Sequence, residues 1–321
     1  MRKDEVNVLS LDGGGIRGLI SADILSYIEG EINKKTSRNL KIGEYFDLIV
    51  GTSTGGILSS IYTVSDNEGK FKYSALDSKN LYLENGKEIF KRTFFRKLKT
   101  LFGLKRPKYS NSNLKNILVK YLGENTKMRD VNSNLMLSSI KLEDSSPYLF
   151  KSYNENTYDN KLIDACLSTS AAPTYFPPHK VGESYLIDGG LAINNPTISA
   201  YIEAKKLFPN KKINILSIGT GSKVGNYNND GVKTKGIIWW VKKIIDITLI
   251  SSVKITEYQS KKLHDEANVK EYLRIEPNLF KSSTNMDDIS DENITNMLSD
   301  SKLTIEMYKN LIDNFIKKVF I

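Results

Sequence analysis

The stretch best suited to chemistry is the pentapeptide Gly51-Thr-Ser-Thr-Gly55, in which Ser53 stands between two glycines. An apolar run ending at Val50 precedes it, and an apolar segment typical of a helix, residues 56–62, follows it. A strand, a sharp turn and a helix are the context in which a G-x-S-x-G motif forms a nucleophile elbow. The glycines leave room for close backbone contacts around a strained serine. Ser53 is therefore the predicted nucleophile, at a helix N-terminus where developing negative charge is favoured.

A second glycine-rich turn, Asp12-Gly-Gly-Gly-Ile-Arg-Gly18, follows the apolar run of residues 6–11. Its glycine spacing also satisfies the G-x-G-x-x-G dinucleotide fingerprint, which expects an acidic residue at the end of the second strand. The second strand here ends on Gly51 and the serine turn instead, which argues against a nucleotide site. The same backbone amides suit an oxyanion hole. If the two strands are parallel neighbours, both turns meet at one edge of the sheet.

An exposed serine is a weak nucleophile and needs a base. Neither of the two histidines, His179 and His264, follows a strand in a tight glycine turn. Asp188 does, because the apolar run 185–187 leads into Asp188-Gly-Gly190. An aspartate is a weak base, so a Ser53–Asp188 dyad requires a strong oxyanion hole, in which each donor contributes on the order of 3 kcal/mol. The candidate donors are the backbone amides of Gly13, Gly14, Gly15 and Thr54.

The elements that must position these residues alternate between strands and helices along the chain. This alternation predicts an α/β fold, with one three-layer α/β/α domain over residues 1–321 and a mostly parallel central sheet. We expect a helix from Leu76 to about Phe102 whose second half, residues 92–102, is amphipathic. We also expect a hairpin through residues 144–147 and a last helix over residues 293–319.

Composition narrows the class of protein. Hydrophobic residues make up 40% of the 321 residues and charged residues 26%, as in an ordinary soluble protein. The single Cys166 excludes a disulfide framework, and with two histidines we expect no metal site. Met1 to Glu5 lead into no apolar signal segment, and the longest apolar run, residues 237–250, is too short and too charged to span a bilayer. We therefore expect a cytoplasmic protein, and its net charge of +9 favours an anionic partner.

The three motifs, in this order, resemble the signature blocks of the patatin-like phospholipases, and the likeness extends to residues 168–178 and 286–288. The resemblance implies a patatin-like fold and a lipid acyl hydrolase of the phospholipase A or lysophospholipase type. It also implies a Ser53–Asp188 dyad that needs no histidine, metal or cofactor, an oxyanion bound by residues 13–15, and an Arg17 that shapes that turn. The supporting motif positions are Asp12, Arg17, Gly18, Gly51, Gly55, Gly189 and Gly190.

Two alternatives come from other classes. A non-hydrolytic acyl-binding protein or acyltransferase could share the fold, and it would show no turnover of short-chain nitrophenyl esters. A nucleic-acid-binding protein would need a basic stripe with interleaved aromatic residues, whereas the basic residues here are scattered, so we expect no DNA or RNA partner.

A phospholipase must reach a bilayer, so we expect the active protein at the periphery of the inner membrane. The candidate docking faces are residues 92–102 and the Trp239 side of a later helix, near Lys242 and Lys243. An unrestrained enzyme would digest its own cell's membrane, so we expect either latency or delivery into another cell. Compact bacterial members similar to this chain include effectors of antiphage defence switched on by a cyclic nucleotide. This likeness favours a cyclic-nucleotide activator and homo-oligomer formation on activation, with a gate in residues 225–235 or 92–108, against a host-delivered or housekeeping hydrolase.

Overall fold

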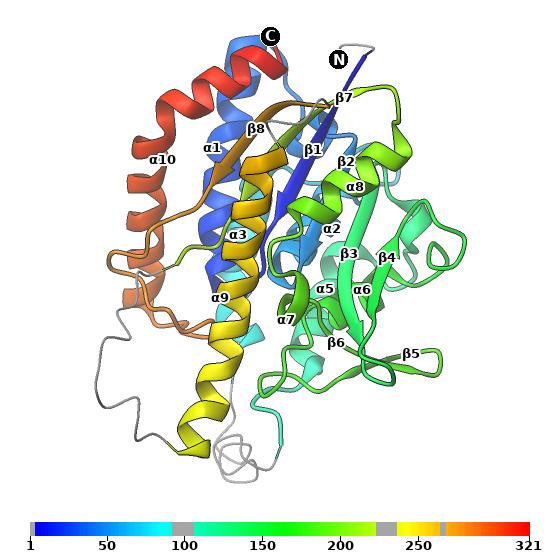
Figure 1. Ribbon diagram of the computed structural model, residues 1–321, viewed down its shortest axis with the longest axis vertical. Coiled ribbons are helices and arrows are strands. Elements are labelled where there is room, and N and C mark those ends of the chain that lie inside the picture. Colours follow the sequence, from blue (N-terminus) through cyan, green and yellow to red (C-terminus); the bar gives the residue numbers. More distant parts are fainter. Residues whose placement is uncertain (1–3, 92–105, 223–235, 264–267) are drawn as a thin grey trace.

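A mostly parallel, eight-stranded sheet forms the middle layer of the described chain (Figure 1). The structure is a computed structural model that describes residues 4–91, 106–222, 236–263 and 268–321. The strand order is β5-β6-β3-β2-β1-β7-β8, and β4 pairs with β3 beside this path. The strands are β1 (Glu5–Leu11), β2 (Leu48–Thr52), β3 (Asn134–Lys141), β4 (Pro147–Lys151), β5 (His179–Val181), β6 (Ser184–Asp188), β7 (Lys212–Ile218) and β8 (Val269–Ile275).

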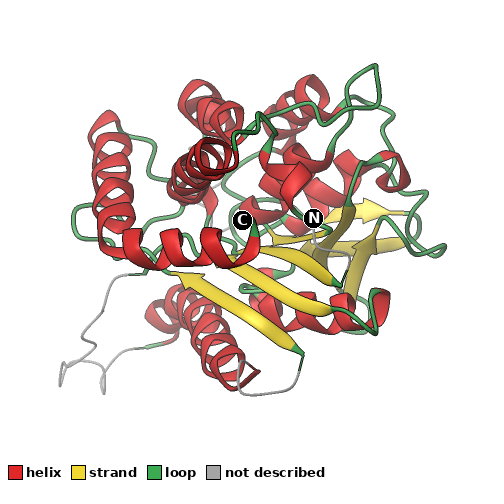
Figure 2. Ribbon diagram, turned by 90° about the horizontal axis from the view of Figure 1, so that it is seen from above, coloured by secondary structure: helices red, strands yellow, loops and turns green. Residues whose placement is uncertain are grey.

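Helices cover both faces of this sheet, so the expected α/β fold with three α/β/α layers is confirmed (Figure 2). One face carries α1 (Gly18–Thr36), α2 (Thr54–Thr63), α3 (Ala75–Ile89), α5 (Asn111–Leu122), α6 (Leu162–Thr169) and α10 (Asp291–Val319). The other face carries α8 (Thr197–Leu207) with α9 (Ile237–Leu263), and the short α7 (Gly190–Ile193) packs against α9. No helix among the described residues is both long and apolar enough to cross a membrane.

The central strands are buried and mostly apolar because both of their faces are covered. Along β1, Leu9 and Leu11 belong to the larger core, which is shared with α1 and α2. Val6 and Val8 alternate with them and pack in a smaller core against α8. This period of two follows from the pleat of a strand, in which successive side chains point to opposite faces.

The two motif-bearing turns lie side by side. Strands β1 and β2 are parallel neighbours, and Leu11 pairs with Gly51, so both strands end at the same edge of the sheet. In an open α/β sheet, the carboxyl edge of the strands is where ligands bind. The expectation that the glycine turn and the serine turn would meet is therefore confirmed.

Some element boundaries differ from expectation. The helix expected over residues 76–102 is α3, which begins at Ala75 and ends at Ile89, and residues 92–105 lie outside the described chain. Its end is set by tertiary packing, because the ring of Phe90 packs against Tyr109 and Phe176. The predicted hairpin is present as the antiparallel pair β3–β4, and the last helix, α10, begins two residues earlier than predicted, at Asp291, after the capping Ser290.

Candidate active site

Ser53 occupies a strained turn between β2 and α2. Its backbone angles are φ 54° and ψ −122°, a left-handed conformation that is unfavourable for a residue with a side chain. The turn is so tight that a Cβ added at Gly55 would lie 2.2 Å from the carbonyl oxygen of Leu11. Glycine at position 55 is therefore required for β1 and α2 to approach each other. The strand, turn and helix around Ser53 have the arrangement of a nucleophile elbow.

The last residue of α6 holds this turn in place. Thr169 accepts a hydrogen bond from the Ser53 amide at 2.9 Å, and its hydroxyl donates to the Ser138 carbonyl oxygen on β3 at 2.6 Å. Sequence reasoning did not assign Thr169 a role, although it lies in the family-like block 168–178. The hydroxyl thus ties the strained backbone of the elbow to the sheet.

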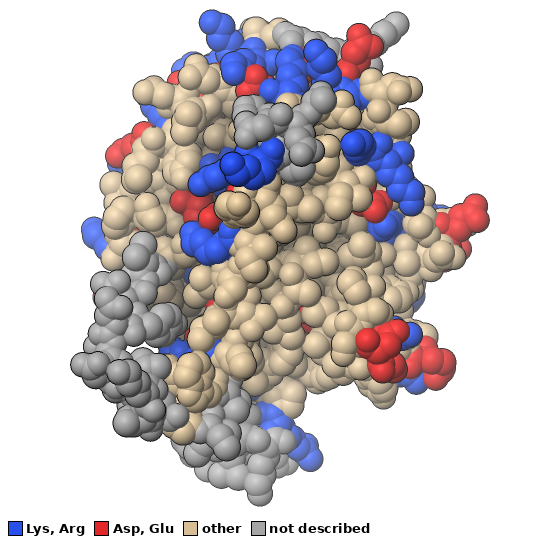
Figure 3. Space-filling view, in the orientation of Figure 1, with Lys and Arg blue, Asp and Glu red and all other residues tan. Residues whose placement is uncertain are grey.

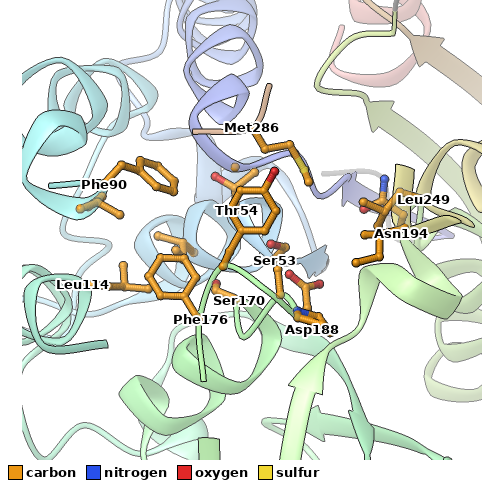
Figure 4. A pocket seen from close by; sticks show the side chains of 18 of the residues that line it. Ser53, Thr54, Phe90, Leu114, Ser170, Phe176, Asp188, Asn194, Leu249 and Met286 are labelled. Carbon is orange, nitrogen blue, oxygen red and sulfur yellow. The ribbon is translucent and has the colours of Figure 1, made fainter. Parts of the chain in front are cut away.

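Asp188, the last residue of β6, faces Ser53 across the site (Figure 4). Its carboxylate accepts a hydrogen bond from the Gly190 amide at 2.7 Å, and the Ser53 side chain lies close enough to favour the ionised form of the carboxylate. Burial raises the pKa of Asp188 to about 6, while Gly190 and Ser53 act in the opposite direction. The result is a carboxylate that is a stronger base than an exposed aspartate and is still mostly ionised at pH 7.

The glycine turn after β1 presents backbone amides beside Ser53. The Gly13 amide donates to the Asn194 carbonyl oxygen at 3.1 Å, so it is already occupied. Within the described residues, the amides of Gly14 and Gly15 have no hydrogen-bond acceptor, and neither does the Thr54 amide at the start of α2. Gly15 has φ 63°, and a Cβ there would lie 2.2 Å from the Met286 carbonyl oxygen. Of the four backbone amides expected as oxyanion-hole donors, those of Gly14, Gly15 and Thr54 are therefore free within the described residues.

Arg17 fixes the shape of this glycine turn. Its guanidinium donates to the Gly14 carbonyl oxygen at 3.3 Å and to the Gly221 carbonyl oxygen at 2.7 Å. Both acceptors are backbone groups, so the turn after β1 is joined to the turn after β7. A neutral side chain of the same length could not make this pair of charge-assisted bonds.

A buried ion-pair cluster lies beneath the same turn. Arg274 on β8 binds both carboxylate oxygens of Asp12, at 2.8 and 2.6 Å, and also contacts Glu276 at 2.6 Å and Glu257 of α9 at 3.4 Å. Burial raises the pKa of Asp12 to about 7, although Arg274 acts to lower it. Sequence reasoning missed Arg274, whose signal was a charged residue inside the apolar run 272–275. The cluster connects the glycine turn to α9.

An apolar pocket opens from these polar groups (Figure 4). Ser53, Thr54 and Asp188 lie on its wall together with Gly14 and Gly15. The rest of the lining is largely aliphatic and aromatic and includes Ile57, Phe90, Leu114, Phe176, Leu249 and Met286. A pocket of this kind suits a ligand with a long apolar part and one polar reacting group.

The remaining polar candidates lie elsewhere. In the part of the chain that the structure describes, no three or more His, Cys, Asp and Glu side chains are grouped so as to hold a metal ion. His179, at the start of β5, contacts Asp164 at 3.0 Å and does not line the pocket. His264 lies outside the described residues.

Comparison with known proteins agrees with this geometry. The model of the patatin-like phospholipase family matches residues 9–201. Patatin-like protein 1 of Oryza sativa subsp. indica is 34% identical, with 85% of this chain and 74% of that protein aligned. Patatin-like protein 1 of Arabidopsis thaliana is 31% identical over 96% of this chain and 86% of that protein. Among solved structures, VipD from Legionella pneumophila aligns with 95% of this chain and 67% of its own, at 10% identity and a TM-score of 0.48. From the family match and these relatives, the chain belongs to the patatin-like phospholipases.

Proposed function

We propose that this lipid acyl hydrolase cleaves the acyl esters of membrane phospholipids through a dyad of Ser53 and Asp188. The observation that carries the proposal is that Ser53, in a strained turn, and the buried Asp188 carboxylate lie together on the wall of an apolar pocket. The pocket wall supports an acyl chain as the bound group, and the dyad supports an ester as the reacting group.

In the proposed reaction, Asp188 takes the proton from Ser53 as the serine oxygen attacks the ester carbonyl carbon. The tetrahedral intermediate collapses, and Asp188 returns the proton to the departing lysophospholipid oxygen. Water then loses a proton to Asp188 and attacks the acyl-enzyme. As the fatty acid leaves, Asp188 returns this proton to the serine oxygen, which restores both Ser53 and the carboxylate. The pKa of about 6 supports this double role of Asp188. A group that acts first as a base and then as an acid works best when its pKa is close to the working pH.

The negative charge on the tetrahedral oxygen is assigned to the amides of Gly14, Gly15 and Thr54. Their lack of another acceptor within the described chain supports this assignment. Each such donor contributes about 3 kcal/mol of transition-state stabilisation in hydrolases of known mechanism. Arg17 supports the hole indirectly, since it binds the carbonyl oxygen of Gly14 and so limits rotation of the peptide that follows.

The test is hydrolysis of phospholipid vesicles and of a soluble short-chain nitrophenyl ester by purified variants. Ser53→Ala should abolish both activities, because loss of a nucleophile lowers kcat by about a millionfold. Asp188→Asn should be nearly as damaging. The double variant His179→Ala, His264→Ala is the control and should keep most activity. If the double-histidine variant is folded but inactive, the proposed dyad is wrong and the mechanism depends on a histidine.

The same assay separates hydrolysis from the alternative of an acyl-binding protein or acyltransferase. A hydrolase releases nitrophenol over many turnovers with water as the only acceptor. An acyltransferase stops after one turnover per site until an alcohol acceptor is added. The described residues contain no observation that favours transfer over hydrolysis, so hydrolysis is the function we propose.

We further propose that activity is held in check until a cyclic nucleotide binds and copies of the chain assemble, as in a membrane-degrading effector of antiphage defence. The net charge of +9 supports an anionic ligand. Of the two expected gate segments, all of residues 225–235 and residues 92–105 of the segment 92–108 lie outside the described residues. Phospholipid hydrolysis with and without cyclic di- and trinucleotides, together with a sizing column, tests this. Full activity of a monomer without additive would point instead to a host-delivered or housekeeping hydrolase.

A further inference from the structure

Helix α9 carries apolar side chains on two opposite faces. On the inner face, Ile245 and Leu249 line the pocket that contains Ser53. With 100° per residue, a second set of positions falls within about 60° of arc on the outer face. We call this set the outer stripe, and it consists of Trp240, Ile244, Ser251, Ile255 and Tyr258.

The outer stripe is open to solvent. Trp240 is 41% exposed, Ile244 and Ile255 are each 57% exposed, and Tyr258 is 69% exposed. Figure 3 shows a broad area without charged side chains over the middle of α9, with basic side chains toward the upper end of the helix. Four large apolar side chains exposed along one face of a helix, in an area without charged side chains, mark a candidate surface for binding a partner.

The chemistry of the stripe fits a lipid bilayer with anionic head groups. Its two ends carry Trp240 and Tyr258, which are side chains that favour the boundary between hydrocarbon and water. Toward the C-terminal end of the helix, Lys261 and Lys262 are exposed. Lys254 is also exposed but pairs with Glu257 at 3.2 Å, and Glu257 in turn contacts Arg274 at 3.4 Å. The outward charge at this end is therefore positive, and each lysine near an anionic surface favours binding.

The position of α9 gives such a surface a purpose. The Ser252 hydroxyl accepts a hydrogen bond from the Asn194 amide at 3.1 Å and donates to the Ala192 carbonyl oxygen at 3.0 Å. This ties α9 to the segment that follows Asp188, and Glu257 ties it to the cluster beneath the glycine turn. A bilayer against the outer stripe would lie next to the wall of the pocket, while the helix stays fixed to both halves of the site.

We infer that the outer stripe of α9 is the surface on which the protein docks to an anionic phospholipid bilayer, with the helix lying in the interface and not crossing it. The docked lipid is also the substrate, so the inference rests on the proposed function. The docking face inferred here is the face of α9 that carries Trp240 and not the expected face that carries Trp239, because the Trp239 side chain is only partly exposed.

Binding is tested in the Ser53→Ala background, which leaves the lipid intact, by sedimentation with phosphatidylglycerol–phosphatidylethanolamine vesicles. Ile244→Glu with Ile255→Glu should weaken partitioning at least about tenfold, since each isoleucine loses its insertion into the interface. The matched control is Leu303→Glu with Met307→Glu on α10, where the side chains are 37% and 59% exposed. It adds the same charge to an apolar surface of another helix and should change partitioning less than twofold. Equal losses in both variants would overturn the inference.

Fluorescence gives an independent measurement, because the two tryptophans of the chain are Trp239 and Trp240. In a Trp239→Phe variant, vesicle binding should shift the emission of Trp240 to the blue, and lipids with brominated acyl chains should quench it. Emission that stays unshifted and unquenched while the protein sediments with vesicles would place the contact elsewhere. A sizing column should show no dimer. If a dimer is present and the α9 substitutions disrupt it, a second copy of the chain, and not a bilayer, covers the outer stripe.

The failure of this inference is distinguishable from the failure of the proposed function. The active protein with Ile244→Glu and Ile255→Glu should hydrolyse a soluble nitrophenyl ester as well as the unaltered protein, because neither side chain lines the pocket. It should lose at least about tenfold in hydrolysis of vesicles. Vesicle hydrolysis at the unaltered rate would overturn the docking surface. An unaltered protein that binds vesicles through α9 but hydrolyses neither substrate, with or without the cyclic nucleotides, would contradict the proposed function alone.

Discussion

Asp188 combines two properties that are usually opposed, because it is 5% exposed and yet must carry charge to act as a base. Burial is the principal cause, and it raises the pKa of Asp188 to about 6. The hydrogen bond from the Gly190 amide prevents a larger rise. A histidine would have a similar pKa without such burial, since its ordinary value is about 6.5. In the proposed dyad, a desolvated carboxylate takes the place of the histidine that acts as the base in the Ser-His-Asp triad.

The pH dependence of the reaction follows from this pKa. We expect kcat/KM for a soluble ester to be level above about pH 7 and to fall as pH drops through about 6, because the protonated carboxyl cannot accept the serine proton. The measurement is a rate profile from pH 4.5 to 8.5. His179→Ala should leave the profile unchanged. A midpoint that moves when His179 is replaced would assign the titration to the histidine.

The same carboxylate should lower the stability of the protein at neutral pH. The pKa of Asp188 is raised from 3.8 to about 6 in the folded state, so folding favours its protonated form. The stabilisation is complete below pH 3.8 and is lost as pH rises through about 6. Above that pH, the ionised carboxylate costs about 3 kcal/mol relative to the protonated form.

We therefore expect Asp188→Asn to be inactive but no less stable than the unaltered protein at pH 8, with a free energy of unfolding up to about 3 kcal/mol higher. An asparagine can still accept the hydrogen bond from the Gly190 amide. Urea denaturation at pH 8 and at pH 4.5 measures the effect, which should shrink at the lower pH. A variant that is less stable at pH 8 would show that the charge is stabilised in the fold.

At the scale of elements, the junction between α6 and the elbow makes the most specific prediction. Thr169→Val keeps the shape of the side chain but removes the acceptor for the Ser53 amide and the donor to Ser138. We expect kcat on a soluble ester to fall about 100-fold, as for other small displacements of a reacting group. Thr169→Ser restores the hydroxyl and should keep most of the rate. Equal losses in the two variants would show that packing, and not the hydrogen bond, is what matters.

At this scale, the backbone turns that form the site could be predicted from the sequence. Close approach of two chain segments demands glycine, so Gly15 and Gly55 leave a visible pattern in the sequence. Apolar runs on both sides then identify the strands and place the turns at one sheet edge. The proximity of Ser53 and Asp188 follows from that placement together with the turn after β6.

Long-range side-chain partners were not predictable. Arg274 is 262 residues from Asp12, and Thr169 is 116 residues from Ser53. No local sequence pattern predicts a contact between residues so far apart in the chain. The same reason explains Gly13, whose amide is taken up by Asn194 from a distant part of the chain.

At the scale of the whole molecule, the net charge of +9 and the apolar stripe of α9 act over different distances. Coulomb attraction draws the protein toward an anionic bilayer over about one Debye length, which is about 10 Å at 0.1 M salt and about 3 Å at 1 M. Apolar contact holds it only after arrival and is not screened by salt. The two contributions can therefore be separated by ionic strength.

We expect hydrolysis of anionic vesicles to fall several-fold between about 0.05 M and 0.5 M sodium chloride, since added salt weakens the attraction between the protein and the surface. Hydrolysis of a soluble, uncharged ester should stay constant over the same range, because the positive charge of the protein does not attract an uncharged substrate. Phosphatidylcholine vesicles supply the second control, with low activity that hardly depends on salt. If salt slows both vesicle types equally, the positive charge plays no part in reaching the membrane, and the apolar stripe alone must account for docking.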